Sequence, residues 1–205
     1  MAQQAGAQSP AQRAFNLLKW PLLVYAAMAS LTIYSWKGNS WFTQHPVTMF
    51  IAYVAMAGNA ALIKKVGGYE NTKSHGVIMT LATLLAIYGF YVIYTQKVMN
   101  NSTKLKADPN FVVPHFKSLH GKVGLAVMVG YTGLAVFGAV VLHPDFGIYK
   151  RQQTWVRFMH KWAGRAITAL SWVCCILGLQ SMGKNFYIQA AFSLPLLFFG
   201  LYVLV

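Results

Sequence analysis

The sequence predicts an all-α membrane protein whose chain crosses the bilayer six times. Hydrophobic residues make up 57% of the chain and charged residues only 10%, whereas soluble domains carry roughly 25% charged residues. The apolar residues are gathered in long runs, separated by short segments that carry charge and turn-forming residues. A run of about 20 apolar residues is long enough to span the bilayer as a helix.

Six such runs follow one another along the chain. Their approximate boundaries are 17–36, 46–63, 75–96, 120–142, 160–182 and 186–205. Backbone polar groups inside a bilayer must be satisfied within the segment, so each run is expected to be a helix and not a strand. We therefore predict a single six-helix transmembrane domain over residues 17–205, preceded by a polar, flexible N-terminal tail over residues 1–16.

The distribution of charge along the chain indicates a membrane protein. Seventeen Lys and Arg residues stand against three acidic residues, a net charge of +14. The basic residues flank the apolar runs and form no single patterned face, which is typical of a membrane protein and not of a nucleic-acid-binding one. With six spans both termini share one side, and that side collects ten of the seventeen basic residues. This bias places the termini on the cytosolic or inner side of the membrane.

Four histidines each stand at the start of one of the central spans. His45 and His120 begin the second and fourth spans, which run in the same direction, so both lie near one membrane face. His75 and His160 begin the third and fifth spans, which run the other way, so both lie near the opposite face. The sequence thus predicts two pairs of imidazoles at two depths, with each pair drawn from two helices.

Paired imidazoles indicate a cofactor. A single histidine of this kind is more often an ordinary interfacial residue, but ionisable groups within a membrane are functional by default. Helix bundles build cofactor sites from side chains on facing helices. A six-coordinate b-type haem takes two axial ligands, on opposite faces of the macrocycle, whereas zinc takes three or four ligands in one place. We therefore predict two haem b groups (iron protoporphyrin IX), with His45/His120 and His75/His160 as the iron ligands, in a core of about residues 40–180 formed by the second to fifth spans.

Two glycines support this interpretation. Gly124 follows His120 by four residues and Gly164 follows His160 by four, so each lies on the face of its histidine, one turn deeper. A side chain there would collide with a flat macrocycle lying against the helix, whereas glycine leaves room. Close helix packing is the alternative role of such glycines. We predict that Gly124 and Gly164 belong to the haem sites.

Two further glycines repeat a longer spacing. Gly138 and Gly178 each lie eighteen residues after the histidine of their own helix. Eighteen residues make five whole turns, so these glycines share the face of the histidine about 27 Å along the axis. That is the depth at which the other histidine pair is expected.

Other polar residues give weaker signals. His115 and His143 are expected to be loop residues. Cys174 and Cys175, adjacent inside an apolar run, are expected to be small buried hydrophobic residues.

Basic residues near each histidine pair are candidate binding groups for substrate or for haem carboxylates. Lys73, Arg157 and Lys161 lie near one pair, and Lys117 and Lys122 near the other. The alternative for each is a basic residue whose long side chain reaches the membrane surface.

Four stretches of the chain carry a family resemblance. They read "FTQHPVTM", "TKSHGVIM", "PHFKSLHGKVGL" and "RFMHKWAGRAI", and they run from the second span to the fifth. In these stretches the sequence resembles the cytochrome b561 family, in particular its short single-domain members. The resemblance implies six membrane helices with two b haems between the four central ones, and it pairs His45 with His120 and His75 with His160.

The family resemblance also implies an activity. Such proteins pass electrons across a membrane, typically from ascorbate on the cytosolic side to monodehydroascorbate or ferric iron on the other. The expected donor site departs from the family pattern, because Gly68 and Thr72 stand seven and three residues before His75, where ascorbate users carry basic residues. The nearest base is Lys73. Other bases on that face could substitute, namely Lys64, Lys65, Arg151 and Arg157.

The expected function is therefore that of a transmembrane oxidoreductase in an endomembrane or organellar membrane. Its partners would be the bilayer and small-molecule electron donors and acceptors, with a homodimer or a larger membrane complex as further assemblies. The alternative is an accessory or structural subunit of a larger electron-transfer complex, which the scarcity of acids and the atypical donor site favour. A haem-free transporter-like bundle is the least favoured alternative, because it leaves the paired histidines without a role.

Overall fold

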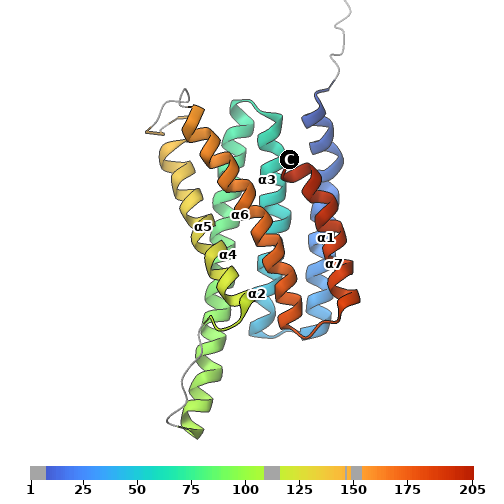
Figure 1. The fold of residues 1–205 in the computed structure, drawn as a ribbon, viewed down its shortest axis with the longest axis vertical. Helices are drawn as coiled ribbons and strands as arrows, with labels where there is room; N and C mark the ends of the chain where they lie inside the picture. The colour runs from blue at the N-terminus through green and yellow to red at the C-terminus, as the bar shows by residue number, and fades with distance from the viewer. Residues whose placement is uncertain (1–7, 109–115, 146, 149–153) are drawn as a thin grey trace, which may run out of the picture.

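The computed structural model describes residues 8–108, 116–145, 147–148 and 154–205. Within these residues the chain is a bundle of long helices and contains no strand (Figure 1). The helices are α1 (Pro10–Lys37), α2 (Trp41–Phe50), η1 (Ile51–Met56), α3 (Ala57–Val66), α4 (Tyr69–Ala107), α5 (Leu119–Val141), α6 (Thr154–Ser181) and α7 (Phe186–Val203). Because α2, η1 and α3 form one continuous rod, six segments are long and apolar enough to cross a membrane. The predicted all-α, six-span fold is confirmed.

The second span contains a feature that the sequence did not predict. Ile51–Met56 forms a π-helical stretch between two α-helical segments. Widening the helix in this way leaves backbone carbonyls free for other partners, and such stretches are frequent at functional sites. Here the Tyr53 carbonyl accepts a hydrogen bond from the Trp172 indole of α6 at 2.9 Å, which fastens the second span to α6 inside the core.

The first helix begins earlier than predicted. Residues 10–16, expected to belong to a flexible tail, are the first part of α1. The Ser9 hydroxyl caps this end by accepting a hydrogen bond from the Gln12 amide at 3.2 Å, and Pro10 follows at the first helical position. Both are strong helix-start signals. They outweigh the polar character of the segment.

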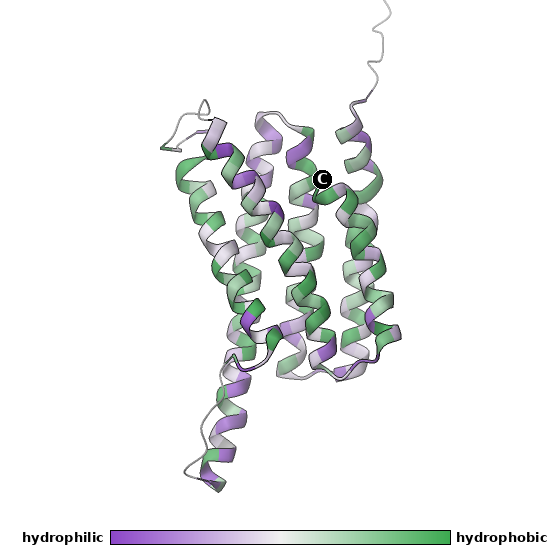
Figure 2. Cartoon of the chain, viewed as in Figure 1, coloured by the Kyte–Doolittle hydropathy of each residue, from purple (hydrophilic) through white to green (hydrophobic). Residues whose placement is uncertain are grey.

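The third span extends beyond the bundle. The apolar run was predicted to end near residue 96, but α4 continues to Ala107 and projects past the other helices (Figure 1). Figure 2 shows that the projecting end is largely hydrophilic, unlike the body of the bundle. No glycine or proline interrupts the chain between residues 90 and 108, so the helix ends only at Asp108, the residue before a proline, where the α conformation is disfavoured.

The arrangement of the helices fixes the two ends of the bundle. The turn between α3 and α4 is made by Gly67 and Gly68, whose φ angles of 80° and 89° lie in the left-handed region that glycine tolerates. α1 packs on the second span, and α7 packs on α1 and α6. The described start of α1 and the C-terminus lie at the same end of the molecule (Figure 1). We call this end the terminal face.

Large apolar side chains cover the outside of the bundle. They include Leu17, Trp20, Leu31, Val129, Leu197 and Leu201, each more than half exposed. The core holds Leu22, Ile33, Val54 and Trp172, which are almost completely buried. A protein with apolar residues on both its inside and its outside is suited to a lipid surrounding. The chain is therefore an integral, multi-pass membrane protein.

Candidate cofactor sites

His45 and His120 face each other across the interior of the bundle. Their ring centroids are 6.1 Å apart. An imidazole nitrogen lies about 2.0–2.1 Å from a bound metal ion, with the ring centre roughly 1 Å behind it, so two imidazoles on opposite sides of one iron have centres roughly 6 Å apart. The observed separation fits a single iron between the two rings.

Helix caps place these two histidines. The Ser40 hydroxyl accepts from the Thr43 amide at 3.3 Å and starts α2, and the Ser118 hydroxyl accepts from the Gly121 amide at 3.1 Å and starts α5. Both histidines therefore lie in the first turns of their helices, at the same end of the bundle. The sequence reasoning placed them there from the starts of the apolar runs.

Hydrogen bonds fix the tautomer of both rings. The Nδ1 atom of His45 lies 2.9 Å from the Gly89 carbonyl oxygen, and the Nδ1 atom of His120 lies 3.1 Å from the Cys174 carbonyl oxygen. A carbonyl only accepts, so Nδ1 carries the proton and Nε2 keeps its lone pair. A histidine that ligates a metal is typically held in this way, by a second partner on its other nitrogen.

A cavity joins the two rings. Its empty space is about 1170 Å³, including the part open to the outside, which is large enough for an organic cofactor. The wall is mostly apolar and contains His45, His120, Gly124, Phe90 and Met128. Together with the ligand geometry, this cavity fits a b-type haem.

The second pair lies towards the terminal face. The Nδ1 atom of His75 donates to the Ala60 carbonyl at 2.9 Å. The Nε2 atom of this ring therefore also keeps its lone pair. His160 lies close enough to His75 for the two rings to interact electrostatically, and Phe137 stacks on it at 6.1 Å. The Nδ1 atom of His160 is buried without a hydrogen-bond partner in the described part of the chain. Such a group is unfavourable by about 1–3 kcal/mol, so His160 differs from the other three histidines, whose Nδ1 atoms lie within hydrogen-bond distance of carbonyls.

Of the two glycines predicted to belong to the sites, Gly124 lies at the His45/His120 cavity. Gly124 lines the cavity, and an added Cβ there would lie 3.5 Å from the Cys174 thiol. An added Cβ at Gly164 would have no atom within 4 Å. A side chain at either position would therefore meet no close contact within the described residues, and the clearance role of the two glycines stays a prediction.

The longer glycine spacing matches the depth of the opposite pair. A Cβ on Gly138 would lie 3.3 Å from Cε1 of His160, and a Cβ on Gly178 would lie 3.2 Å from Cε1 of His120. Each glycine thus makes room for the imidazole of the neighbouring helix. The five-turn spacing predicted this depth, and the partner of each glycine is a histidine ring.

Backbone carbonyls are the functional groups that sequence reasoning missed. Gly89, Ala60 and Cys174 supply the acceptors for three of the four histidines. They lie fourteen or fifteen residues after the histidine of their own span, about four helical turns. The regular spacing is visible in the chain, but every residue has a carbonyl, so nothing distinguished these three in advance.

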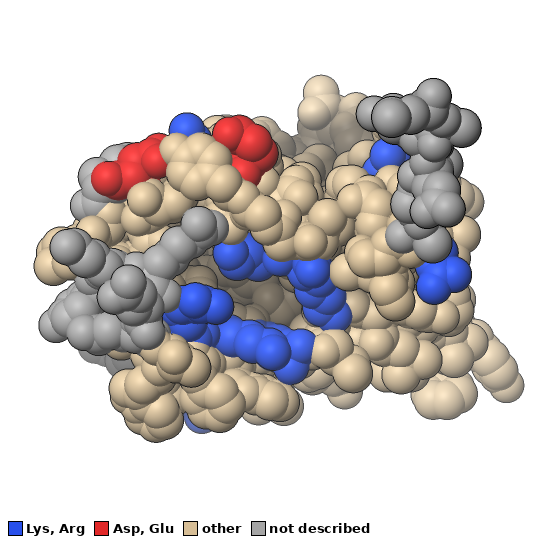
Figure 3. Space-filling model, turned by 90° about the horizontal axis from the view of Figure 1, so that it is seen from above, with Lys and Arg blue, Asp and Glu red and all other residues tan. Residues whose placement is uncertain are grey.

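Basic side chains surround a hollow on the terminal face (Figure 3). Lys65 lies within electrostatic range of both Lys161 and Arg165. Lys64 lies within electrostatic range of both His75 and His160. Lys65 donates to the Tyr202 carbonyl and Arg165 to the Val205 carbonyl oxygen.

We call Lys64, Lys65, Lys161 and Arg165 the basic cluster. Of the residues predicted to bind substrate, it contains Lys161, while Arg157 is exposed two turns before Arg165.

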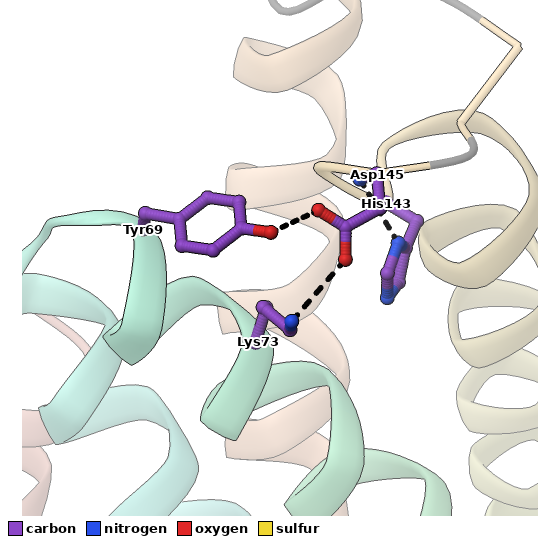
Figure 4. Close-up of polar contacts among 4 residues, drawn as sticks. All are labelled: Tyr69, Lys73, His143 and Asp145. Atoms are coloured by element: carbon purple, nitrogen blue, oxygen red, sulfur yellow. Dashed lines mark hydrogen bonds and ion pairs between the residues drawn. The ribbon is translucent and has the colours of Figure 1, made fainter.

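Lys73 has a different environment from the one expected. Its ammonium lies 3.3 Å from the Asp145 carboxylate and 5.1 Å from the centre of the Tyr69 ring. Figure 4 shows the Tyr69 hydroxyl donating to the same carboxylate, and the Asp145 amide donating to Nδ1 of His143 at 3.2 Å. The lysine nearest to His75 in the sequence is thus engaged by the loop after α5. His143 lies in this loop, as expected, whereas His115 lies outside the described residues.

The Lys73–Asp145 contact predicts a dependence of stability on pH. The Tyr69 hydroxyl, and then the Lys73 ammonium, hold the pKa of the Asp145 carboxyl below its ordinary value. A lowered folded-state pKa stabilises the protein above the unfolded value, near 4, and this stabilisation is lost as the pH falls through the folded pKa. Because the pair is exposed, Asp145→Asn is expected to lower the Tm by about 1 °C or less at pH 7.

Thermal unfolding in detergent between pH 3 and pH 8 measures this effect. The difference between Asp145→Asn and the unmodified protein should be constant above pH 5 and should shrink as the pH falls below the ordinary carboxyl pKa, near 4. Glu70→Gln is the control, because this neighbouring acid forms no ion pair within the described residues. An Asp145→Asn difference that grows on acidification would contradict the assignment.

On the opposite face, a basic residue that was not predicted lines the cavity. Lys97 is part of the wall beside His45 and His120 and lies within electrostatic range of both rings. The predicted residues Lys117 and Lys122 are exposed and are not part of the cavity wall. Lys97 was missed because the apolar run stops at residue 96, whereas the helix that carries this lysine continues.

Comparison with known proteins agrees with this geometry. Residues 44–184 match the family model of eukaryotic cytochrome b561. The chain belongs to the cytochrome b561 family. The matched range contains all four paired histidines of this cytochrome and leaves out α1 and α7.

Two curated relatives in this family have printed activities. A lysosomal membrane ascorbate-dependent ferrireductase of Danio rerio is 25% identical over 163 residues, which cover 76% of this chain and 60% of the relative. A transmembrane ascorbate-dependent reductase of Homo sapiens is 27% identical over 176 residues, which cover 82% of this chain and 65% of the relative. The chain therefore spans less than two thirds of the length of each.

Proposed function

We propose that this chain is a transmembrane di-haem b-type cytochrome that carries electrons from one membrane face to the other. The observation that carries the proposal is the His45/His120 pair, with ring centroids 6.1 Å apart and with both Nδ1 atoms bonded to carbonyls. This arrangement leaves both Nε2 lone pairs for one metal ion. His75, with the same kind of bond, supports a second site at the other depth.

The chain supplies the ligands, their orientation and a dry surrounding. His45 and His120 would hold one haem and His75 and His160 the other, while Gly124 and Gly164 leave room for the rings. When bound, haem b supplies one-electron chemistry between ferric and ferrous iron. The apolar walls exclude water, and the carbonyl partners prevent the imidazoles from rotating.

The basic cluster supports an anionic donor at the terminal face. The four cations of the basic cluster raise the local concentration of anions and speed their arrival. Ascorbate is an anionic donor of this class, and the two relatives are named as ascorbate-dependent. We propose that an ascorbate-type donor reduces the His75/His160 site. The basic bias of this face also supports a cytosolic position for both termini.

The acceptor would be reached from the opposite face. His45 and His120 lie near the starts of α2 and α5 at that face, and Lys97 stands in the wall of their cavity. A cation in this position suits a carboxylate of the haem or an anionic acceptor. We propose monodehydroascorbate or a ferric complex as acceptor, in an endomembrane, for which the lysosomal relative gives support.

An absorption spectrum with haem quantification tests the proposal. The purified chain should contain two b haems that ascorbate reduces and a ferric complex reoxidises. A preparation without haem would refute the proposal. Two haems that ascorbate fails to reduce would favour an accessory subunit instead, an alternative supported by the pairing of Lys73 with Asp145.

Reversing one charge of the basic cluster is expected to slow the reduction of the protein by ascorbate. Lys161→Glu replaces a cation with an anion beside Lys65 and Arg165, and it is expected to slow reduction by ascorbate about tenfold at low salt, because steering by charged clefts changes association rates by about 10–1000-fold. Stopped-flow reduction at two salt concentrations measures the effect, which should shrink at high salt.

Lys106→Glu is the matched control for this experiment. It makes the same change in charge at the projecting end of α4, on the opposite face. Equal slowing in both variants would contradict a donor site at the terminal face. Both proteins should retain two haems.

A further inference from the structure

The thiol of Cys174 lies against the outer nitrogen of His120. Its Sγ atom is 3.5 Å from Nδ1 of His120, while the carbonyl of the same cysteine accepts from that nitrogen at 3.1 Å. One residue thus presents two acceptors to one imidazole N–H. The cysteine is buried and forms part of the cavity wall.

The direction of the thiol follows from its second contact. Sγ donates to the backbone carbonyl of His120 at 3.7 Å, a distance within reach of a sulfur hydrogen bond. Because the S–H bond points at that carbonyl, the lone pairs of the sulfur are directed towards the Nδ1–H group of the ring. The N–H is then shared between a backbone oxygen and a side-chain sulfur, and only the sulfur can be removed by substitution.

The neighbouring cysteine shows that this contact is not a general property of the segment. Cys175 is equally buried, but within the described residues it has no hydrogen bond to a histidine. Among the paired histidines, His45 and His75 bond to a carbonyl alone. The thiol therefore belongs to one site.

We propose that Cys174 is a positioning residue that orients His120 and lowers the reduction potential of the His45/His120 site. An additional acceptor on Nδ1–H makes the imidazole a better electron donor to iron, which favours the ferric state. The inference rests on the proposed haem site and assigns its tuning to a named side chain. Sequence reasoning had expected this cysteine to serve only as a small apolar residue.

Redox titration of the haem-loaded full-length chain tests this proposal. Cys174→Ala keeps the backbone carbonyl and removes the sulfur, so one potential should rise. The expected change is about a threefold higher ferrous-to-ferric ratio at a fixed applied potential, or roughly 28 mV at 59 mV per tenfold for one electron. Cys174→Ser, which restores an acceptor, should return most of the shift. Cys175→Ala is the control and should titrate like the unmodified protein.

The result can fail in distinguishable ways. An unchanged potential in a Cys174→Ala protein with two haems would overturn the role of the thiol and leave the haem sites intact. Equal shifts in the Cys175→Ala protein, or at both haems, would also overturn it. Absence of haem from the unmodified chain would instead refute the proposed function. If the Cys174→Ala protein binds haem poorly, the Cys174→Ser protein is the deciding variant. A serine protein that lacks one haem would overturn the proposal.

Discussion

Replacement of His120 by alanine is expected to produce a protein that inserts into the membrane and holds one haem instead of two. The substitution removes one of the two rings that stand 6.1 Å apart and leaves the His75/His160 site untouched. His160→Ala should remove the other haem. The helices persist in both variants, because alanine favours helix and the six-span pattern does not depend on these residues.

Haem quantification and difference spectra measure this outcome. The unmodified chain should give two haems, and each variant should give one, with transmembrane electron transfer lost in both. His143→Ala is the control, because His143 lies in the loop after α5, beside Asp145. Two haems in both His120→Ala and His160→Ala would refute the pairing.

Replacement of Gly89 by alanine is expected to damage both the packing of the bundle and the first site. A Cβ on Gly89 would overlap the Thr48 hydroxyl oxygen and would lie 3.2 Å from the Met49 methyl carbon. α2 and α4 would have to move apart, which costs about 1–3 kcal/mol for an overpacked interior. The Gly89 carbonyl would then leave Nδ1 of His45, so the His45/His120 haem should be bound weakly or lost.

Thermal unfolding in detergent and haem content should be measured on the same samples. Gly76→Ala is the matched control, because it makes the same change on the same helix, where an added Cβ has no atom within 4 Å. It should be neutral or slightly stabilising, since alanine is the better helix former. Equal stability of the two variants would contradict the close approach of α2 and α4 at Gly89.

The sequence allowed the six spans and the depth of the histidines to be predicted. Both follow from a one-dimensional pattern, because a helix in lipid must be apolar over about 20 residues and alternate spans must run in opposite directions. A histidine at the start of a span is therefore placed at one face by counting alone. Counting in this way pairs His45 with His120, and their rings lie 6.1 Å apart.

The missed features depend on groups that the sequence does not distinguish. The π-helical stretch at Ile51–Met56 contains no glycine or proline, and it is stabilised by contacts with other helices, such as the Trp172 bond to the Tyr53 carbonyl. The partner of Lys73 was equally unpredictable. Asp145 lies 72 residues away in sequence, and only the folded chain brings the two together.

The second and third spans each accept a hydrogen bond from the histidine of the other, and this reciprocal bonding bears on the speed of electron transfer. The second span carries His45 and gives its Ala60 carbonyl to His75, whereas α4 carries His75 and gives its Gly89 carbonyl to His45. Neither helix can rotate or slide without breaking both bonds. If His45 and His75 hold haem as proposed, ligands that are fixed before the electron arrives need little rearrangement when the charge changes. The bundle thus favours a low reorganisation energy.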